Sequence, residues 1–227
     1  ARLTILLTGP IAIRGPSPFN RIGFCMKKNL LAVAVLCALT SGAAFAQQAE
    51  SPWLVRVRAV HLDSANKDST GLGLSVNNKT IPEVDISYFF NKNVAAELIL
   101  TVPQKHDLRA NGTNIGSLKH LPPSLLLQYH FDAPGFKPYV GVGVNYTRFS
   151  GVRFDPAVAA ALNPSIDKNS FGGALQVGVD IPLSKNLYLN FDVKKVYIKT
   201  DVFAGGAKQG TFKVDPVLVG VGLGWRF

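Results

Sequence analysis

The sequence predicts an all-β protein: an eight-stranded antiparallel transmembrane β-barrel with short periplasmic turns and long extracellular loops. Three observations support this fold: the alternation of the last segment, the number of alternating segments, and the lengths of the connections between them. Residues 212–227 alternate apolar residues with small or polar ones and end on an aromatic. Successive side chains of a membrane strand face lipid and lumen in turn, so this segment is expected to be a barrel strand.

The same segment sets the phase of the alternation. Its odd-numbered apolar residues, from Val217 to Phe227, form one stripe expected to face lipid, and Arg226 falls on the lumenal stripe. A buried edge strand of a soluble sandwich can alternate in this way, but it seldom ends on Trp-Arg-Phe without a polar tail. We therefore predict that Trp225 and Phe227 form the barrel-assembly signal.

Eight segments reach the length of about 9–11 residues that a tilted membrane strand requires. They are residues 53–62, 81–90, 93–102, 122–131, 136–149, 171–181, 186–199 and 211–227. An even number of strands permits closure into an antiparallel barrel.

The connections alternate in length. Residues 63–80, 103–121, 150–170 and 201–210 are longer connections, whereas 91–92, 132–135 and 182–185 are short. Outer-membrane barrels have short periplasmic turns and longer external loops. A soluble lipocalin-like barrel has no reason to sort its loops in this way, and it would need a polar outer surface.

The N-terminal region predicts export. From Met26 a short basic start (Lys27, Lys28) precedes an apolar run over 30–39 and the small-x-small pattern Ala44-Phe45-Ala46. This is the pattern of a signal peptide over 26–46, cleaved after Ala46. Residues 1–25 are interpreted as an upstream extension without a folded role. The mature chain, 47–227, is expected to be an integral protein of the bacterial outer membrane.

Charge and cysteine content exclude several function classes. Cys25 and Cys37 both precede the predicted cleavage site, so 47–227 offers no disulfide, cysteine metal site or thiol nucleophile. Half of the formal net charge of +10 also precedes that site. The remaining Lys and Arg are scattered rather than gathered on one helical face with aromatics, so nucleic-acid binding is not expected. No cofactor is expected either.

The lumenal stripes carry polar residues of both signs. The interior of an eight-stranded barrel is only wide enough for its side chains, so charges there must pair. We interpret them as a polar plug in the periplasmic half, with a polar ion path as the alternative. The plug residues are Arg56, Glu97, Gln128, His130, Gln176, Asp180 and Arg226, and Arg58, Glu83, Asp85, Asn190 and Asp192 share the inward phase. Because Lys194-Lys195 interrupts the alternation, a β-bulge is expected there.

Several motifs taken in order resemble the OmpW family of outer-membrane proteins. They are residues 86–90 (ISYFF), 93–98 (NVAAEL), 121–124 (LPPS), 128–131 (QYHF), 137–146 (KPYVGVGVNY), 176–180 (QVGVD), 214–216 (VDP) and 224–227 (GWRF). The resemblance implies a monomer with a narrow, largely hydrophobic channel, open to the outside and blocked toward the periplasm. It implies that small hydrophobic molecules pass inward and leave sideways through a gap in the wall. The implied partners are these solutes, outer-membrane lipid and lipopolysaccharide, and the barrel-assembly machinery.

Pro122 and Pro123 are the candidates for the lateral gate. Neither can donate a backbone hydrogen bond to a neighbouring strand. The alternative is that the prolines merely end a loop. The candidate residues of the hydrophobic lumen are Val60, Ile99, Ser124, Leu126 and Leu218, which could equally be packing filler. Lys194 and Lys195 stand where the family has mostly aromatic residues, which challenges the expectation of an apolar outer lumen.

Two other function classes are alternatives to a channel. An enzyme would need a nucleophile or metal motif, and no Gly-x-Ser-x-Gly or His-x-x-x-His pattern accompanies His61, His106, His120 and His130. His106-Asp107 is interpreted as solvated loop polarity rather than a surface ligand or metal site. The remaining alternative is a surface receptor or adhesin whose loops bind a partner, with a possible short helix over 156–162. An apolar lumen would favour the channel, and a fully packed lumen would favour the scaffold.

Overall fold

The computed structural model describes residues 51–227. The predictions for the extension 1–25, the signal peptide 26–46 and its cleavage at Ala44 and Ala46 lie outside the described residues. Everything below concerns the compact unit that residues 51–227 form.

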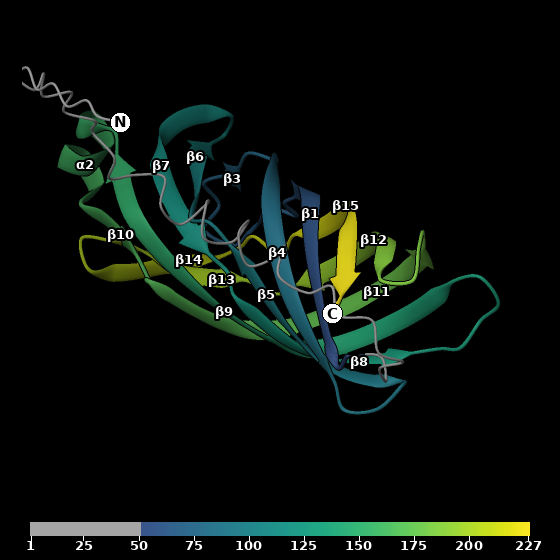
Figure 1. Ribbon diagram of the computed structural model, residues 1–227. Helices are drawn as coiled ribbons and strands as arrows, with labels where there is room; N and C mark the ends of the chain where they lie inside the picture. Colours follow the sequence, from purple (N-terminus) through teal and green to yellow (C-terminus); the bar gives the residue numbers. More distant parts are fainter. Residues whose placement is uncertain (1–50) are drawn as a thin grey trace, which may run out of the picture. The chain divides into compact units, whose positions relative to one another are not determined.

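Eight long strands close into one antiparallel barrel, which confirms the predicted fold class (Figure 1). They are β1 (Trp53–Asp63), β4 (Lys79–Phe89), β5 (Val94–Thr101), β8 (Ser124–His130), β9 (Lys137–Phe154), β11 (Asn169–Pro182), β12 (Leu187–Val196) and β15 (Val217–Arg226). Their order around the wall is β11-β12-β15-β1-β4-β5-β8-β9, and β9 pairs with β11 to complete the circle.

Short turns join β4 to β5, β8 to β9 and β11 to β12 at one end of the barrel, called here the turn end. In the first of these turns the Asn91 side-chain oxygen accepts hydrogen bonds from the backbone N–H groups of Asn93 and Val94, both at 2.9 Å. This local bonding replaces ladder hydrogen bonds over the reversal and fixes the register of the next strand. The predicted sorting of connections by length is confirmed.

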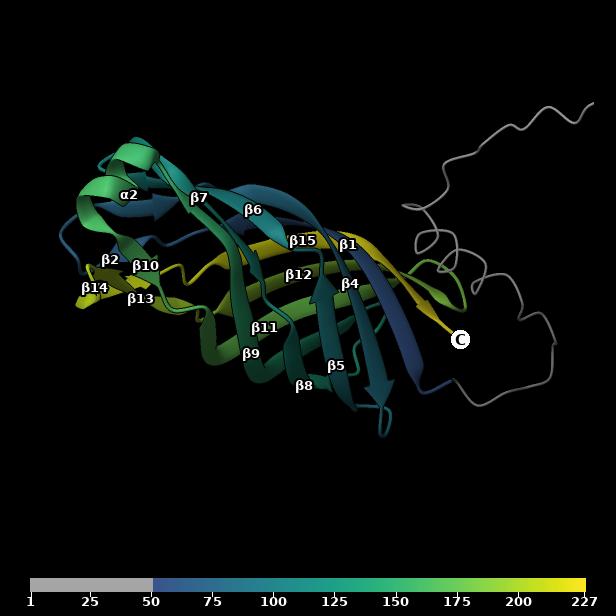
Figure 2. The same cartoon turned by 90° about the vertical axis from the view of Figure 1, so that its left-hand side faces the viewer.

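The opposite end, called the loop end, is more ordered than predicted (Figure 2). Its connections contain β2 (Lys67–Asp68), β3 (Leu74–Val76), β6 (Gln104–Ala110), β7 (Thr113–Leu121), α2 (Pro156–Leu162), β10 (Pro164–Ile166), β13 (Lys199–Ala204) and β14 (Ala207–Lys213). Strands β7, β6 and β3 continue the barrel sheet outward from β9, and β10, β13, β14 and β2 form a second sheet. The expected helix over 156–162 is confirmed, with Asp155 as its N-cap.

The prediction of one strand over 211–227 is wrong. Residues 211–213 belong to β14, and β15 begins at Val217. Between them Asp215 adopts a positive φ of 33° and Pro216 follows it. A left-handed residue followed by proline interrupts a β ladder, so the chain passes here from the second sheet into the barrel.

The outer surface of the barrel carries the predicted apolar stripes. Val142 is 58% exposed and Leu127 is 54% exposed, while their sequence neighbours face the interior. Trp53, Tyr88 and Phe90 stack edge to face near the turn end, with ring centroids 4.8 and 5.4 Å apart. Trp225 and Phe227 also point outward, as the phase of β15 predicts. Among residues 51–227, no helix combines the length and apolar character needed to cross a membrane.

The β-bulge expected at Lys194-Lys195 is wrong. The register of β12 with β11 and with β15 runs through both lysines without a shift. Even-numbered residues stay inside along the whole segment, so Lys194 is 2% exposed and Val196 and Ile198 are buried. The apparent break in the pattern arises because the interior changes from charged to apolar at this height, while the backbone remains regular.

Candidate functional site in the barrel lumen

The lumen is divided into layers along the barrel axis. Nearest the turn end is a small apolar cluster of Leu54, Phe89, Ala95 and Tyr188. Above it lies the charged layer, made of Arg56, Arg58, Glu83, Asp85, Glu97, Asp180, Asp192 and Lys194. Toward the loop end lies the apolar layer, made of Val60, Leu62, Leu74, Val76, Ile81, Ile99, Leu108, Leu118, Leu126, Phe149, Ala174, Val196, Ile198, Phe212, Val214 and Leu218.

Arg56 and Arg58 stand at the centre of the charged layer. The Arg56 guanidinium contacts Asp180 at 2.7 Å and Asp85 at 3.0 Å. Arg58 contacts Glu97 at 2.9 Å and also pairs with Asp85. Both arginine side chains are fully buried, so removing either one would leave carboxylates in the interior without their partner.

Lys194 completes the charged layer on its loop-end side. Its ammonium lies 2.6 Å from Glu83 Oε1 and 2.7 Å from Asp192 Oδ1. Sequence reasoning assigned this lysine no site, because the carboxylates that neutralise it come from β4 and from its own strand. The layer as a whole pairs three cations with five carboxylates.

Neutral polar groups fill the rest of this height. Gln176 donates to Glu97 at 2.9 Å and to Asp192 at 2.7 Å, and Gln128 donates to Gln176 at 2.9 Å. The Tyr139 hydroxyl donates to Asp192 at 3.1 Å.

A glycine on the wall makes room for the Tyr139 ring. A Cβ at Gly178 would lie 2.3 Å from the ring, so only glycine fits opposite it.

The residues predicted as the polar plug therefore lie at one height of the barrel or close to it. His130 stacks on Tyr139 with ring centroids 4.9 Å apart, and its Nε2 lies 3.0 Å from Gln128 Oε1. Arg226 lies nearer the turn end, with its guanidinium carbon 4.3 Å from the centroid of the Phe89 ring. Mutual hydrogen bonds and ion pairs of this number favour a single well-defined arrangement of the layer.

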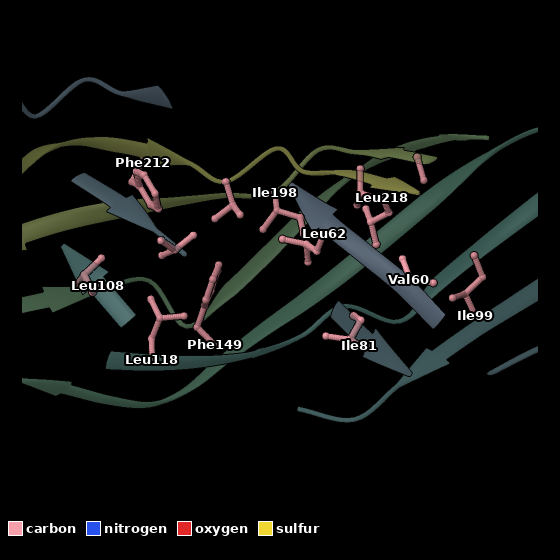
Figure 3. Close-up of a cluster of buried hydrophobic side chains, with 14 of the residues drawn as sticks. Val60, Leu62, Ile81, Ile99, Leu108, Leu118, Phe149, Ile198, Phe212 and Leu218 are labelled. Atoms are coloured by element: carbon pink, nitrogen blue, oxygen red, sulfur yellow. The ribbon is translucent and has the colours of Figure 1, made fainter. Parts of the chain in front are cut away.

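The apolar layer occupies the loop-end half of the lumen (Figure 3). Val60, Ile99, Leu126 and Leu218, the predicted lumen residues, all belong to it and are at most 5% exposed. Ser124, also predicted, is buried beside them. These side chains pack against one another and leave a cavity of about 20 Å³, large enough for roughly one water molecule.

This cavity lies at the boundary of the two layers. Glu83 and Lys194 border it from the charged layer. The rest of its lining is Leu62, Ile81, Ile99, Thr101, Pro122, Ser124, Val196, Ile198, Pro216 and Leu218. The ion pair between Glu83 and Lys194 therefore lies between the apolar layer and the turn end.

The barrel wall is interrupted beside this cavity. The ladder between β5 and β8 ends at the pair Ile99 and Ser124. Beyond it, Thr101 pairs on its other side with β4, and Pro122-Pro123 stands between the ends of β7 and β8. We call this place the wall break. Thr101 and Pro122, which lie on its two sides, both line the cavity.

Asn145 on β9 holds the proline segment in place. Its side-chain amide donates to the carbonyl oxygens of Pro122 and Pro123 at 3.2 and 3.1 Å and to Ser124 Oγ at 2.9 Å. The Tyr146 backbone N–H also donates to Pro123 at 3.1 Å. Both prolines are thus bound on the β9 side through their carbonyls, and Pro122 lacks the N–H group that would point toward β5. Sequence reasoning missed Asn145, because only the β8–β9 register brings it to the prolines.

The interpretation of His106 as a solvated loop residue is wrong. His106 on β6 and His120 on β7 are 0% and 1% exposed, and their ring centroids lie 4.6 Å apart. Burial above all, together with the neighbouring His106 and Lys79, lowers the pKa of His120 to about 3. Burial also lowers the pKa of His106, against a hydrogen bond to Asn77 that raises it. Both rings are therefore neutral at pH 7.

No set of three or more His, Cys, Asp and Glu side chains within 51–227 is arranged to hold a metal ion. The only cysteines of the chain, Cys25 and Cys37, lie outside this range.

The sequence matches known outer-membrane proteins over the whole barrel. The model described as the OmpW family matches residues 54–227. The chain belongs to the OmpW family. It is 34% identical to outer membrane protein W of Escherichia coli over 213 residues, 89% of this chain and 100% of that protein. It is 40% identical over 188 residues to the uncharacterized outer-membrane protein y4mB of Sinorhizobium fredii, 78% of this chain and 80% of that one.

Two further similarities bear on fold and function. The chain is 28% identical over 196 residues to the dibenzothiophene metabolism operon protein PahQ of Pseudomonas aeruginosa, 78% of this chain and 90% of that protein. The crystal structure of outer membrane protein OprG from Pseudomonas aeruginosa superposes with a TM-score of 0.68 at 24% identity, covering 81% of this chain and 99% of that one. This last likeness supports the fold alone.

Membership of the OmpW family places the protein in the outer membrane as an integral β-barrel. The turn end accordingly faces the periplasm and the loop end faces the outside. The apolar layer is then the outward half of the lumen, and the charged layer lies between it and the periplasm.

Proposed function

We propose that this OmpW-family protein is a channel that admits small hydrophobic molecules from outside and releases them sideways into the membrane at the wall break. The proposal rests on one observation: the apolar layer, the charged layer and the wall break all meet at the same cavity. The apolar layer ends at a cavity, the charged layer closes that cavity toward the periplasm, and Thr101 and Pro122 border it at the wall break. An apolar solute that reaches the cavity has an unpaired stretch of wall on one side and buried charges below.

Energetics favours the sideways route. Moving an apolar molecule through the charged layer would separate ion pairs such as Lys194 with Glu83 and leave charges unpaired in the interior. Movement within the apolar layer exchanges one set of nonpolar contacts for another, at little net cost. The free space of about 20 Å³ means that apolar side chains must separate as a solute passes.

The relatives are consistent with apolar solutes. PahQ is named for an operon of dibenzothiophene metabolism, and dibenzothiophene is an apolar aromatic molecule. On this proposal the protein acts as a monomer, with lipid receiving the solute. The plug residues, the lumen residues and the gate prolines then have the roles that the sequence suggested.

Uptake by vesicles with lipopolysaccharide in the outer leaflet tests the proposal. We expect refolded wild-type protein to speed naphthalene uptake, and Pro122→Ala/Pro123→Ala to lose most of that gain. Pro122→Ala supplies a backbone N–H group on the β5 side, with which β8 can extend its ladder toward Thr101, and Pro123→Ala supplies one on the β9 side, where the Pro123 carbonyl already pairs with Tyr146.

Pro156→Ala/Pro164→Ala is the matched control, because these prolines lie in the connection around α2, away from the wall break. It should retain wild-type uptake. Uptake by wild type no faster than by protein-free vesicles would refute the channel. Uptake that survives in folded Pro122→Ala/Pro123→Ala would refute lateral release.

A surface receptor is the second candidate function. It is favoured by the close packing of the apolar layer and by a polar pocket of about 230 Å³ at the loop end. The pocket is lined by Asp167, Asn169, Ser170, Phe171, Lys199, Thr200, Asp201, Lys208 and Thr211. This candidate predicts no acceleration of naphthalene uptake, so the same experiment separates the two.

A further inference from the structure

The His106–His120 pair lies beside the route that the proposed function requires. From the outside toward the cavity, the chain places Leu118 and His120 of β7 first, then Pro122 in the connection, and then Ser124 of β8. His120 is opposite Phe149 of the apolar layer in the β7–β9 register, and His106 is opposite Leu118 in the β6–β7 register. The two rings therefore lie beside the apolar layer, on the loop-end side of the cavity.

Both rings carry a buried nitrogen without a hydrogen-bond partner. Nε2 of His106 and Nε2 of His120 are both buried. The side chains around them are largely apolar and offer no hydrogen-bond partner. Buried polar atoms are normally paired, and an unpaired one in a native structure calls for an explanation. A ligand that brings the missing partner is one such explanation.

The tautomer of His106 follows from its other nitrogen. Nδ1 lies 2.8 Å from the backbone carbonyl oxygen of Asn77, which can only accept, so Nδ1 carries the proton. In the neutral ring Nε2 is then a bare acceptor. The neighbouring His120 Nε2 can accept or donate, according to its own tautomer. A hydroxyl group suits this pair, because it donates one hydrogen bond and accepts another.

We propose that His106 and His120 form a polar subsite within the apolar layer, which recognises neutral apolar solutes that carry one hydroxyl group. The hydroxyl donates to His106 Nε2 and accepts from His120 Nε2–H. The apolar remainder of the solute contacts Leu118 and Phe149. This inference rests on the proposed channel function and adds a solute class to it.

The charges near the pair disfavour a cationic ligand. Lys79 lies close enough to lower the pKa of both rings, while Asp107 raises that of His106. A cationic solute would be repelled by Lys79. The two rings stay unprotonated at neutral pH, and so remain able to accept.

The test compares 2-naphthol with 2-methoxynaphthalene and naphthalene, which lack the hydroxyl proton. Binding to the refolded full-length barrel is measured by equilibrium dialysis and corrected for partition into protein-free vesicles. Wild type should prefer 2-naphthol over 2-methoxynaphthalene by about fivefold or more, the effect of one hydrogen bond. In the wild-type protein, ¹⁵N NMR of the imidazoles should show the His106 Nε2 resonance shifting with 2-naphthol but not with 2-methoxynaphthalene.

Substitution gives a second readout. His106→Phe should bind all three compounds equally, whereas His61→Phe should keep the preference, because His61 is on the outer face of β1. Equal binding of the compounds by wild type, without a shift of Nε2, overturns the subsite and leaves the channel intact. Binding of none of them overturns both. If His106→Phe does not fold, the NMR result on wild type decides.

Discussion

Along β1 the interior of the barrel changes character within a few residues: Arg56 and Arg58 point into the charged layer, and Val60 and Leu62 point into the apolar layer. The same eight strands thus enclose two kinds of interior. The charged layer is held by directional contacts between fixed partners, such as Arg56 with Asp180 at 2.7 Å. The apolar layer is held by nonpolar contacts, which are non-directional and do not require one fixed arrangement of the side chains.

On the proposed function, this difference would let one narrow barrel both close toward the periplasm and admit a solute. Separating the ion pairs of the charged layer would leave charges unpaired in the interior, so that layer stays shut. Side chains of the apolar layer can move apart when a solute replaces their contacts. The wall break lies at the boundary of the two layers, and on the proposal a solute stopped by the charges would meet Pro122 and Pro123 there.

Removing a cation from the charged layer should have the largest effect on stability. Arg58→Met leaves the carboxylates of Asp85, Glu97 and their neighbours without one of their cations, and we expect the free energy of unfolding to fall by about 3–5 kcal/mol. Equilibrium urea unfolding of the refolded barrel measures it. Lys92→Met is the control, because its ion pair with Asp132 is exposed at the turn end and should matter little. Equal losses in the two variants would contradict the account of the charged layer.

Truncating a side chain of the apolar layer should cost somewhat less. Leu126→Ala removes a side chain that is 1% exposed and opens a cavity, so we expect a loss of about 3 kcal/mol. The adjacent Leu127→Ala, on the lipid face, is the control and should lose less, because lipid tails fill the space. The same urea series compares them, and a greater loss for Leu127→Ala would show that the apolar layer is not a packed core.

Acid should weaken the β6–β7 hairpin. The pKa of His120 is lowered to about 3 in the folded state from an ordinary value of 6.5, so the closed hairpin favours the neutral ring. The contribution of the neutral His120 ring to the free energy of unfolding is complete above about pH 6.5. It falls as the pH drops toward 3 and is smaller by about 2 kcal/mol at pH 5. Amide hydrogen exchange over Gln104–Ala110 and Thr113–Leu121 measures this. His120→Leu should abolish the extra pH dependence, and a hairpin equally protected at pH 7 and pH 5 would contradict it.

Loosening the proline segment should have the smallest effect on stability. Asn145→Leu removes the amide that donates to Pro122 and Pro123, for a loss of about 1 kcal/mol. Asn145→Asp is the size-matched variant that loses the donor, and it should lose more stability than Asn145→Leu, because it places a buried carboxylate against the carbonyl oxygens of Pro122 and Pro123. The amide of Tyr146, bonded to Pro123, should exchange faster in both. An aspartate variant as protected as wild type would show that Asn145 does not fix the wall break.

The barrel could be predicted because the alternation of side chains along a strand depends only on residues close together in the sequence. Period-two alternation, as in Val217 to Phe227, reports which face of a strand meets lipid whatever its neighbours are. Short turns such as that at Asn91 follow from nearby residues in the same way. The inward phase of Arg56, Glu97 and Asp180 followed from the same count.

The rest depends on pairings between distant strands. Lys194 looked like a break in the pattern because its partner Glu83 is more than a hundred residues away. The sequence of β6 resembles a loop because the residues on its outer face, Lys105, Asp107 and Arg109, are charged instead of apolar. Its pairing with β7 and β3 is what makes it a strand. The His106–His120 contact and the role of Asn145 likewise require the register, which composition does not contain.

The most direct test of the two-layer account measures both layers in one preparation. Vesicles with lipopolysaccharide in the outer leaflet, containing the refolded barrel, are assayed for naphthalene uptake and for conductance of small ions across the same membrane. The account predicts faster naphthalene uptake than in protein-free vesicles, with ion conductance unchanged. Ion conductance typical of an open pore, or naphthalene uptake no faster than without protein, would contradict it.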